Sequence, residues 1–279
     1  MRTIAWIICA LATMIASQAV AQQPCPTLVV ATTADVVNGN TSSPCALIAN
    51  PGADGISLRE AVLAANNATG SGIVTINFAS SLAGQTITLN SAGSTLDITR
   101  SEITVAGFAQ NGQPAVTINA NNMFVVFNVL ASNFTLGSLN ITGVASGNFG
   151  VQIWAGAGWT PSAPQDVTNI VINGNVFANT NGSNAGVPLT LGMNATSASG
   201  AVLSAVAITN NTFSGFPADA VRLTIWGTNN TIQNAAIIGN TFTNTLTPIE
   251  LVPANSAANN STLTRRLSAI HLPIMSNPL

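Results

Sequence analysis

The sequence predicts an all-β fold, a right-handed parallel β-helix (solenoid) with a short N-terminal capping helix. Three observations predict it. Apolar and polar residues alternate in short segments, similar segments recur about every 30 to 36 residues, and Gly, Asn and Pro clusters separate them. A coil of short parallel strands, each stacked about 4.8 Å above the last, accounts for all three.

The repeat is clearest in residues 170–177, 206–213 and 236–242, which share an alternating apolar pair, an Asn, and a Phe two residues later. A helical repeat is disfavoured because the periodic residues are Val, Ile, Thr and Phe at a spacing of two. Aligned on this pattern, the equivalent positions are Val105, Leu136, Ile172, Ile208 and Ile238.

A second alternating set lies between these repeats. It includes Val151/Ile153, Val221/Leu223/Ile225 and Ile249/Leu251. The shared Asn has a physical reason, because Asn tolerates the left-handed conformation of a sharp turn, and its amide can bond the backbone or a stacked neighbour. We expect a structural ladder of Asn175, Asn211 and Asn240.

The segment before the repeats has the features of a cap. Ser57 and Glu60 have the spacing of a capping box. An apolar stripe on the helix that follows would cover the open end of the coil. We therefore expect an N-terminal cap region at 22–72 and β-helix rungs at 73–262, beginning with the strand 73–78.

The first 21 residues resemble an export signal. Arg2 precedes an uncharged run over 4–15, and Ala19-Val20-Ala21 has the small-x-small pattern of a cleavage site. The alternative is a membrane anchor, but the run is shorter than the roughly 20 residues of a bilayer span. We expect a protein that is secreted or on the cell surface, with no membrane span after cleavage.

Cleavage would leave Cys25 and Cys45, and two cysteines in an exported chain favour one disulfide. The alternative is two free thiols. The chain has no C-x-x-C pair and one His, His271, so no metal site is expected.

Charge is sparse. The chain has 6 Lys plus Arg and 8 Asp plus Glu, and its 5% charged residues compare with about 25% in ordinary domains. Nucleic acid is not an expected partner, because no basic patch is present.

Residues 29–35, Cys45 and 56–67 resemble the N-terminal signature of bacterial CSLREA-domain proteins. Segments 74–78, 82–89 and 96–100 continue the resemblance, which covers roughly 29–107. The remainder resembles pectate-lyase-like β-helix repeats. Ile56 stands where the family name places Cys. The resemblance implies a secreted or surface β-helix, often without known activity.

Enzymatic signatures are weak. A β-helix lyase would need Ca²⁺ held by carboxylates, and a hydrolase needs two carboxyls close together, but the eight carboxylates are scattered in sequence. No cofactor is otherwise expected. The best pair is Asp219 with Arg222. Arg222 could act as a base or sugar-acid clamp, but a surface ion pair of little energetic value is the favoured interpretation.

Three tryptophans predict a glycan-binding strip. Trp154 and Trp226 each follow an inward Ile and should point outward, two rungs apart, and Trp159 lies in a nearby loop. Exposed Trp rings can stack on sugars. The alternative is that these rings pack under loops at the rim of the coil.

Residues 263–279 form an atypical tail in which the repeat stops, and no C-terminal cap is recognisable, so we expect a truncated chain. The leading functional hypothesis is a structural or adhesive surface module that binds a polysaccharide or cell-surface glycan. The alternatives are a polysaccharide lyase or glycoside hydrolase with an unrecognised site, and an inactive fragment of a larger exported passenger protein.

Overall fold

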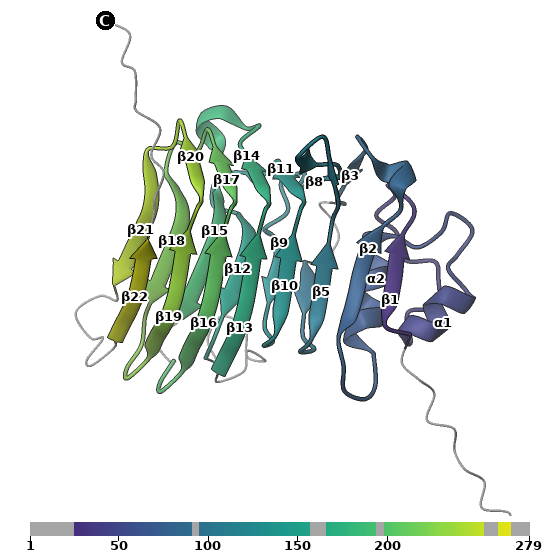
Figure 1. The fold of residues 1–279 in the computed structure, drawn as a ribbon, viewed down its shortest axis with the longest axis horizontal. Helices are drawn as coiled ribbons and strands as arrows, with labels where there is room; N and C mark the ends of the chain where they lie inside the picture. The colour runs from purple at the N-terminus through teal and green to yellow at the C-terminus, as the bar shows by residue number, and fades with distance from the viewer. Residues whose placement is uncertain (1–24, 91–94, 157–165, 194–197, 254–261, 269–279) are drawn as a thin grey trace, which may run out of the picture.

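The structure is a computed structural model that describes residues 25–90, 95–156, 166–193, 198–253 and 262–268. The chain is mostly β, and its long strands pair in parallel in three sheets. The expectation of an all-β parallel fold is therefore confirmed. Two helices lie at the N-terminal end of the sheets (Figure 1).

The first sheet has eight described strands. In spatial order they are β1 (Thr27–Val30), β2 (Val74–Phe78), β5 (Ile103–Ala106), β10 (Phe134–Gly137), β13 (Asp166–Asn173), β16 (Val202–Thr209), β19 (Thr231–Ile238) and β22 (Thr262–Ser268).

The second and third sheets have six described strands each. The second contains β3 (Thr86–Thr88), β8 (Thr117–Asn119), β11 (Asn140–Thr142), β14 (Val176–Ala178), β17 (Thr212–Ser214) and β20 (Thr241–Thr243). The third contains β4 (Leu96–Ile98), β9 (Val125–Val129), β12 (Phe149–Trp154), β15 (Val187–Met193), β18 (Asp219–Ile225) and β21 (Thr247–Pro253).

From β2 onward the chain visits the first, second and third sheets in that cyclic order, ending at β22 in the first. A short antiparallel pair, β6 (Ala109–Gln110) with β7 (Gln113–Pro114), is inserted after β5. Two 3₁₀ turns lie at Ser80–Leu82 and Gly182–Asn184. Every strand in the three large sheets thus pairs with strands from the preceding or following circuit.

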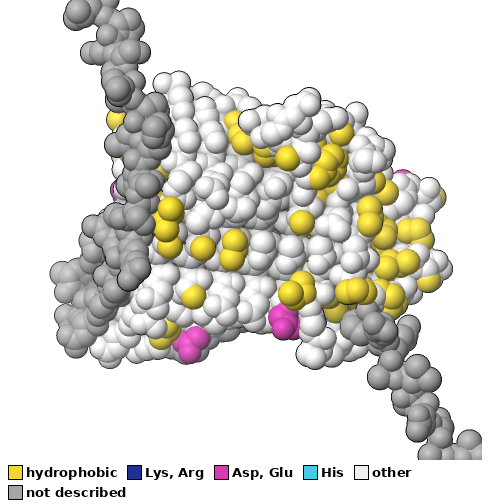
Figure 2. Space-filling model, in the orientation of Figure 1, with side chains coloured by type: hydrophobic (Ala, Val, Ile, Leu, Met, Phe, Trp, Pro, Cys, Tyr) yellow, Lys and Arg dark blue, Asp and Glu magenta, His cyan; other side chains and the backbone are white. Residues whose placement is uncertain are grey.

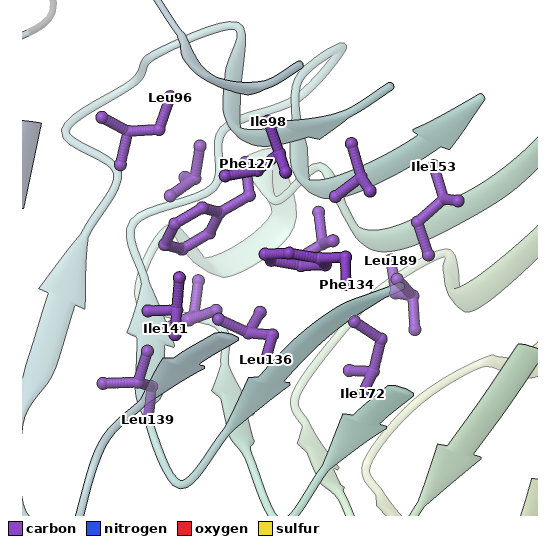
Figure 3. Packing of buried hydrophobic residues seen from close by; sticks show 14 of the residues in the cluster. Leu96, Ile98, Phe127, Phe134, Leu136, Leu139, Ile141, Ile153, Ile172 and Leu189 are labelled. Atoms are coloured by element: carbon purple, nitrogen blue, oxygen red, sulfur yellow. The ribbon is translucent and has the colours of Figure 1, made fainter. Parts of the chain in front are cut away.

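One apolar cluster fills the space between the sheets. Figure 3 shows Phe127 of the third sheet and Phe134 of the first beside Ile141 of the second. Alternation creates this core, because successive residues of a strand face opposite sides. The outer surface is different: on the face in Figure 2, hydrophobic side chains are scattered among backbone and side chains that are neither hydrophobic nor charged, with small acidic patches.

The register corrects one expected equivalence. Ile208 pairs with Ile237, not with Ile238. Ile237 is buried and Ile238 is partly exposed, so the two adjacent isoleucines face opposite sides of the sheet. The alignment was one residue out because either Ile fits an alternating pattern.

Two further differences lie at the ends of the first sheet. β1 pairs with β2 and so extends the sheet beyond the strand that was expected to come first. At the other end β22 pairs with β19 through Ser268, so strand pairing continues past residue 263, where the tail was expected to begin.

Candidate functional site

The N-terminal helices are held by the motif that the sequence identifies. Helix α1 (Pro44–Ala49) precedes helix α2 (Leu58–Asn66), and Ser57 caps α2 in a complete capping box with Glu60. Glu60 Oε1 also accepts hydrogen bonds from the backbone N–H groups of Asn38 and Gly39, both at 2.6 Å. This carboxylate therefore organises the loop after β1.

Cys25 and Cys45 form a disulfide, with their Cα atoms 5.1 Å apart. The bond joins the start of the described chain, just before β1, to α1. It therefore ties the helical region to the edge strand of the first sheet.

Asn175, Asn211 and Asn240 form the ladder that their repeat indicates. Asn211 Oδ1 accepts from the backbone N and Nδ2 of Asn175 at 2.9 and 3.1 Å, and Asn240 Oδ1 accepts in the same way from Asn211 at 2.9 and 3.0 Å. Each Nδ2 also donates to a backbone carbonyl, and all three residues are buried. The amides are thus bonded to the fold itself.

Arg222 and Asp219 form a bidentate pair. Arg222 Nε donates to Asp219 Oδ2 at 2.7 Å and Nη2 donates to Oδ1 at 2.8 Å. The Asp219 side chain is only 4% exposed and that of Arg222 is 30% exposed. The pair is therefore more enclosed than the surface ion pair that the sequence favoured.

Glu250 is a third member that sequence reasoning missed. Its Oε2 accepts from Arg222 Nε at 3.2 Å, and it pairs in register with Arg222 on the neighbouring strand β21. The sequence contains a signal for this pairing, because the apolar residues on either side of Arg222 align with those on either side of Glu250. One guanidinium is thus shared by two carboxylates.

Arg222 and Glu250 belong to a longer row on the outer face of the third sheet, where register places one polar residue on each strand. The apolar residues on either side of each, such as Val221 and Leu223, belong to the core. We call this set the polar row. Its members are Asp97, Asn128, Gln152, Thr190, Arg222 and Glu250.

The middle of the polar row contains buried atoms without hydrogen-bond partners among the described residues. They are Asn128 Oδ1, Gln152 Oε1 and Thr190 Oγ1, on three successive strands. The three residues are 8%, 7% and 0% exposed. Each unsatisfied buried group costs about 1–3 kcal/mol, and buried atoms of this kind are normally bonded to ordered water or to another polar group.

Asn128 shows which atoms the row offers. Its Nδ2 donates to Asp97 Oδ1 at 2.9 Å, and Thr95 Oγ1 donates to the same oxygen at 2.5 Å. Because only the NH₂ group can donate to a carboxylate, this bond fixes the orientation of the amide. Asn128 Oδ1 is therefore an acceptor that lacks a donor.

Trp154 lies two residues beyond Gln152 on β12. It is 5% exposed and packs with Leu130, and its Nε1 is a buried donor without a described partner. Its register partner is Gly192, which has φ 136° and where a Cβ would overlap the carbonyl oxygen of Thr224. A glycine is therefore required beside the indole ring.

The expected alignment of tryptophans is not present. The register runs from Trp154 through Gly192 to Thr224, so Trp226 lies two residues past the equivalent position and follows the end of β18. Trp226 is partly buried. The sequence was misleading because each Trp follows an Ile, whereas the register aligns Ile153 with Leu223 and not with Ile225. Trp159 lies outside the described residues, as do residues 1–21 and His271.

Within the described ranges, no group of three or more His, Cys, Asp or Glu side chains is arranged to hold a metal ion. None of the described helices is long and apolar enough to cross a bilayer. Comparison of the chain with protein-family models, curated proteins and solved structures found no match.

Proposed function

We propose that this chain is a right-handed parallel β-helix, secreted or held at a bacterial cell surface, that binds a polysaccharide or cell-surface glycan along the polar row. The observation that carries the proposal is the line of three unsatisfied acceptors at Asn128, Gln152 and Thr190, with the unsatisfied Trp154 donor beside it. Sugar hydroxyl groups donate and accept, so a glycan can satisfy both kinds of atom.

The cyclic order of strands supports the β-helix, since a coil is the simplest path that visits three parallel sheets in turn. Export is supported by the signal-like N-terminus and by the disulfide, which is typical of oxidising compartments. Membership of the CSLREA-domain group is part of the same proposal. Three residues of this motif support it. Ser57 and Glu60 cap α2, and Glu60 and Arg59 form hydrogen bonds with the loop after β1.

Polysaccharide cleavage is the second candidate, and the convergence of Asp219 and Glu250 on Arg222 favours it. Two carboxylates close together are the groups that glycoside hydrolysis uses, and an Arg can act as the base of a lyase. The argument against cleavage is that the carboxylates of Asp219 and Glu250 both form ion pairs with the same guanidinium.

The test is to incubate the purified chain with a panel of polysaccharides, with and without Ca²⁺. Retention on the polymer and release of reducing or unsaturated ends are followed together. If the protein binds a polysaccharide without cleaving it, the protein should be retained on the polymer and no reducing or unsaturated ends should be released. Gln152→Leu should then weaken this retention at least tenfold. Gln233→Leu is the matched control, because Gln233 is exposed on the first sheet.

Release of ends that is lost in Arg222→Ala would establish the enzymatic alternative. Absence of both retention and release across the panel would refute glycan recognition and leave a scaffold.

A further inference from the structure

We infer that the polymer recognised by the polar row is an uncharged polysaccharide and not a polyanionic one. The inference rests on the proposed function and narrows it to one class of ligand. Three independent features of the described residues support it, namely the engagement of the arginines, the charge of the row and the kinds of hydrogen-bonding atom that it offers.

The described arginine side chains are engaged within the protein. Arg59 pairs with Asp35 at 2.7 Å, and Arg222 pairs with Asp219 and Glu250. Arg100 donates to the backbone carbonyl oxygens of Ala68, Gly70, Gly72, Ser101 and Glu102. The sequence has no Lys. Recognition of a uronate or sulfate group relies on such cations, and the one cation in the polar row, Arg222, is already held by two carboxylates.

The polar row is itself acidic. Asp97 lies at one end and Glu250 at the other, and Asp219 contacts Arg222. Three carboxylates therefore accompany one guanidinium. At physiological ionic strength charges act over about 8 Å, so a polyanion laid along the row would be repelled at both ends.

The unsatisfied atoms match hydroxyl groups. Asn128 Oδ1 and Gln152 Oε1 accept hydrogen bonds, Thr190 Oγ1 can accept or donate, and Trp154 Nε1 only donates. A carboxylate or sulfate offers acceptors alone, so each such group of a polyanion that lies against Asn128 or Gln152 would place oxygen against oxygen, and only the hydroxyl groups of that polymer could bond there. A hydroxyl group serves every one of these atoms.

The geometry favours a polymer over a single sugar. The row has one member on each of six neighbouring strands, and strands lie about 4.8 Å apart. It is therefore about 24 Å long, measured across the strands. Its Arg222–Glu250 end is the accessible one, since those side chains are 30% and 43% exposed. The middle of the row is covered, so a linear chain would contact this end first and would reach Thr190, Gln152 and Asn128 only when the groups that cover them move aside.

The experiment compares polymers that share a backbone and differ in charge. Hydroxyethylcellulose is compared with carboxymethylcellulose, and neutral galactan with polygalacturonate, by affinity electrophoresis at low and high NaCl. We expect retention on at least one neutral polymer, unchanged by salt, and at least tenfold weaker binding to its anionic counterpart. Glu250→Gln removes one repelling charge, so it should reduce the difference in affinity between the neutral polymer and its anionic counterpart.

Gln152→Leu and Thr190→Val should each weaken binding to the neutral polymer at least tenfold, with Gln233→Leu as the control. Circular dichroism of each variant checks the fold, and two variants at different positions guard against a folding defect in one. Salt-sensitive retention on the anionic polymers alone would overturn this inference and leave the proposed glycan binding intact. Retention on no polymer would overturn the proposed function as well.

Discussion

Arg59 of α2 and Asp35 of the loop after β1 form a bidentate salt bridge. Nε donates to Oδ1 at 2.8 Å and Nη2 donates to Oδ2 at 2.7 Å. The side chains are 10% and 2% exposed. Asp35 Oδ2 also accepts from the backbone N of Asn90 at 2.7 Å. One carboxylate therefore joins the capping helix, the loop after β1 and the segment that follows β3.

Asp35→Asn should lower the free energy of unfolding by roughly 3–5 kcal/mol, because it removes the carboxylate charge that faces the enclosed Arg59 guanidinium. Urea denaturation followed by circular dichroism measures the change. Asp54→Asn is the control, since Asp54 is exposed, and it should change stability by less than about 0.5 kcal/mol. Equal effects at the two positions would show that the salt bridge does not hold the cap.

Asn211→Ala should destabilise the protein by roughly 2–4 kcal/mol. It removes the acceptor of two hydrogen bonds from Asn175 and the donor to the carbonyl of Ile172, all of them buried. Thermal unfolding is the measurement. Asn173→Ala, at the exposed last position of β13, should lower the free energy of unfolding by less than about 1 kcal/mol. A small loss at Asn211 would mean that water replaces the ladder.

Phe213→Ala should cost about 3–5 kcal/mol, because the residue is fully buried and large cavities are expensive. Its ring stacks between those of Phe177 and Phe242, with centroids 4.9 and 5.1 Å away. Chemical denaturation of this variant is compared with that of Phe124→Ala, whose ring is 62% exposed. If the two losses were equal, the stack would have no special part in stability.

Ala205→Asn should raise the free energy of unfolding by about 0.5–1 kcal/mol. Ala205 has φ 52°, a left-handed conformation that disfavours a Cβ but that Asn tolerates. The neighbouring strands have Asn169 at φ 59° and Asn234 at φ 54° in the corresponding bends. Thermal denaturation tests the gain, and a loss of stability would show that the backbone is not strained at this position.

Thr190→Val should leave unliganded stability unchanged or raise it by up to about 1 kcal/mol. The hydroxyl is buried without a described partner, and an apolar group of the same shape avoids that cost. The contrasting variant is Ser57→Ala, which removes a hydroxyl that caps α2 and donates to Val36 O at 2.6 Å. That variant should lose about 1–2 kcal/mol. Denaturant titration of both proteins separates the two cases, and a clear loss at Thr190 would reveal a bound water.

The repeating residues explain how much of the fold was predictable. Asn175 and Phe177 recur with the same residue types on later strands, so their ladder and stack follow from alignment alone. The pair Ile237 and Ile238 could not be assigned in this way, because both are apolar and only the paired strand decides which of them is buried. The same ambiguity displaced Trp226 relative to Trp154.

The polar row could not be predicted for a different reason. Its members are all of different types, so no repeated letter marks it, and polar residues on an outer face are usually exposed. What distinguishes Gln152 and Thr190 is that Gln152 Oε1 and Thr190 Oγ1 are enclosed and have no hydrogen-bond partner in the part of the chain that the structure describes. That property depends on side-chain packing in three dimensions and leaves no pattern in the sequence.

The strands stay in register although the segments joining them differ in length. The ladder joins residues 36 apart at Asn175 and Asn211 but only 29 apart at Asn211 and Asn240. Lengthening a connecting segment changes loop entropy only slightly, whereas one residue inserted within a strand would turn its buried side chains outward. Insertions and deletions should therefore accumulate between the strands during evolution, where new recognition loops can be acquired without altering the core.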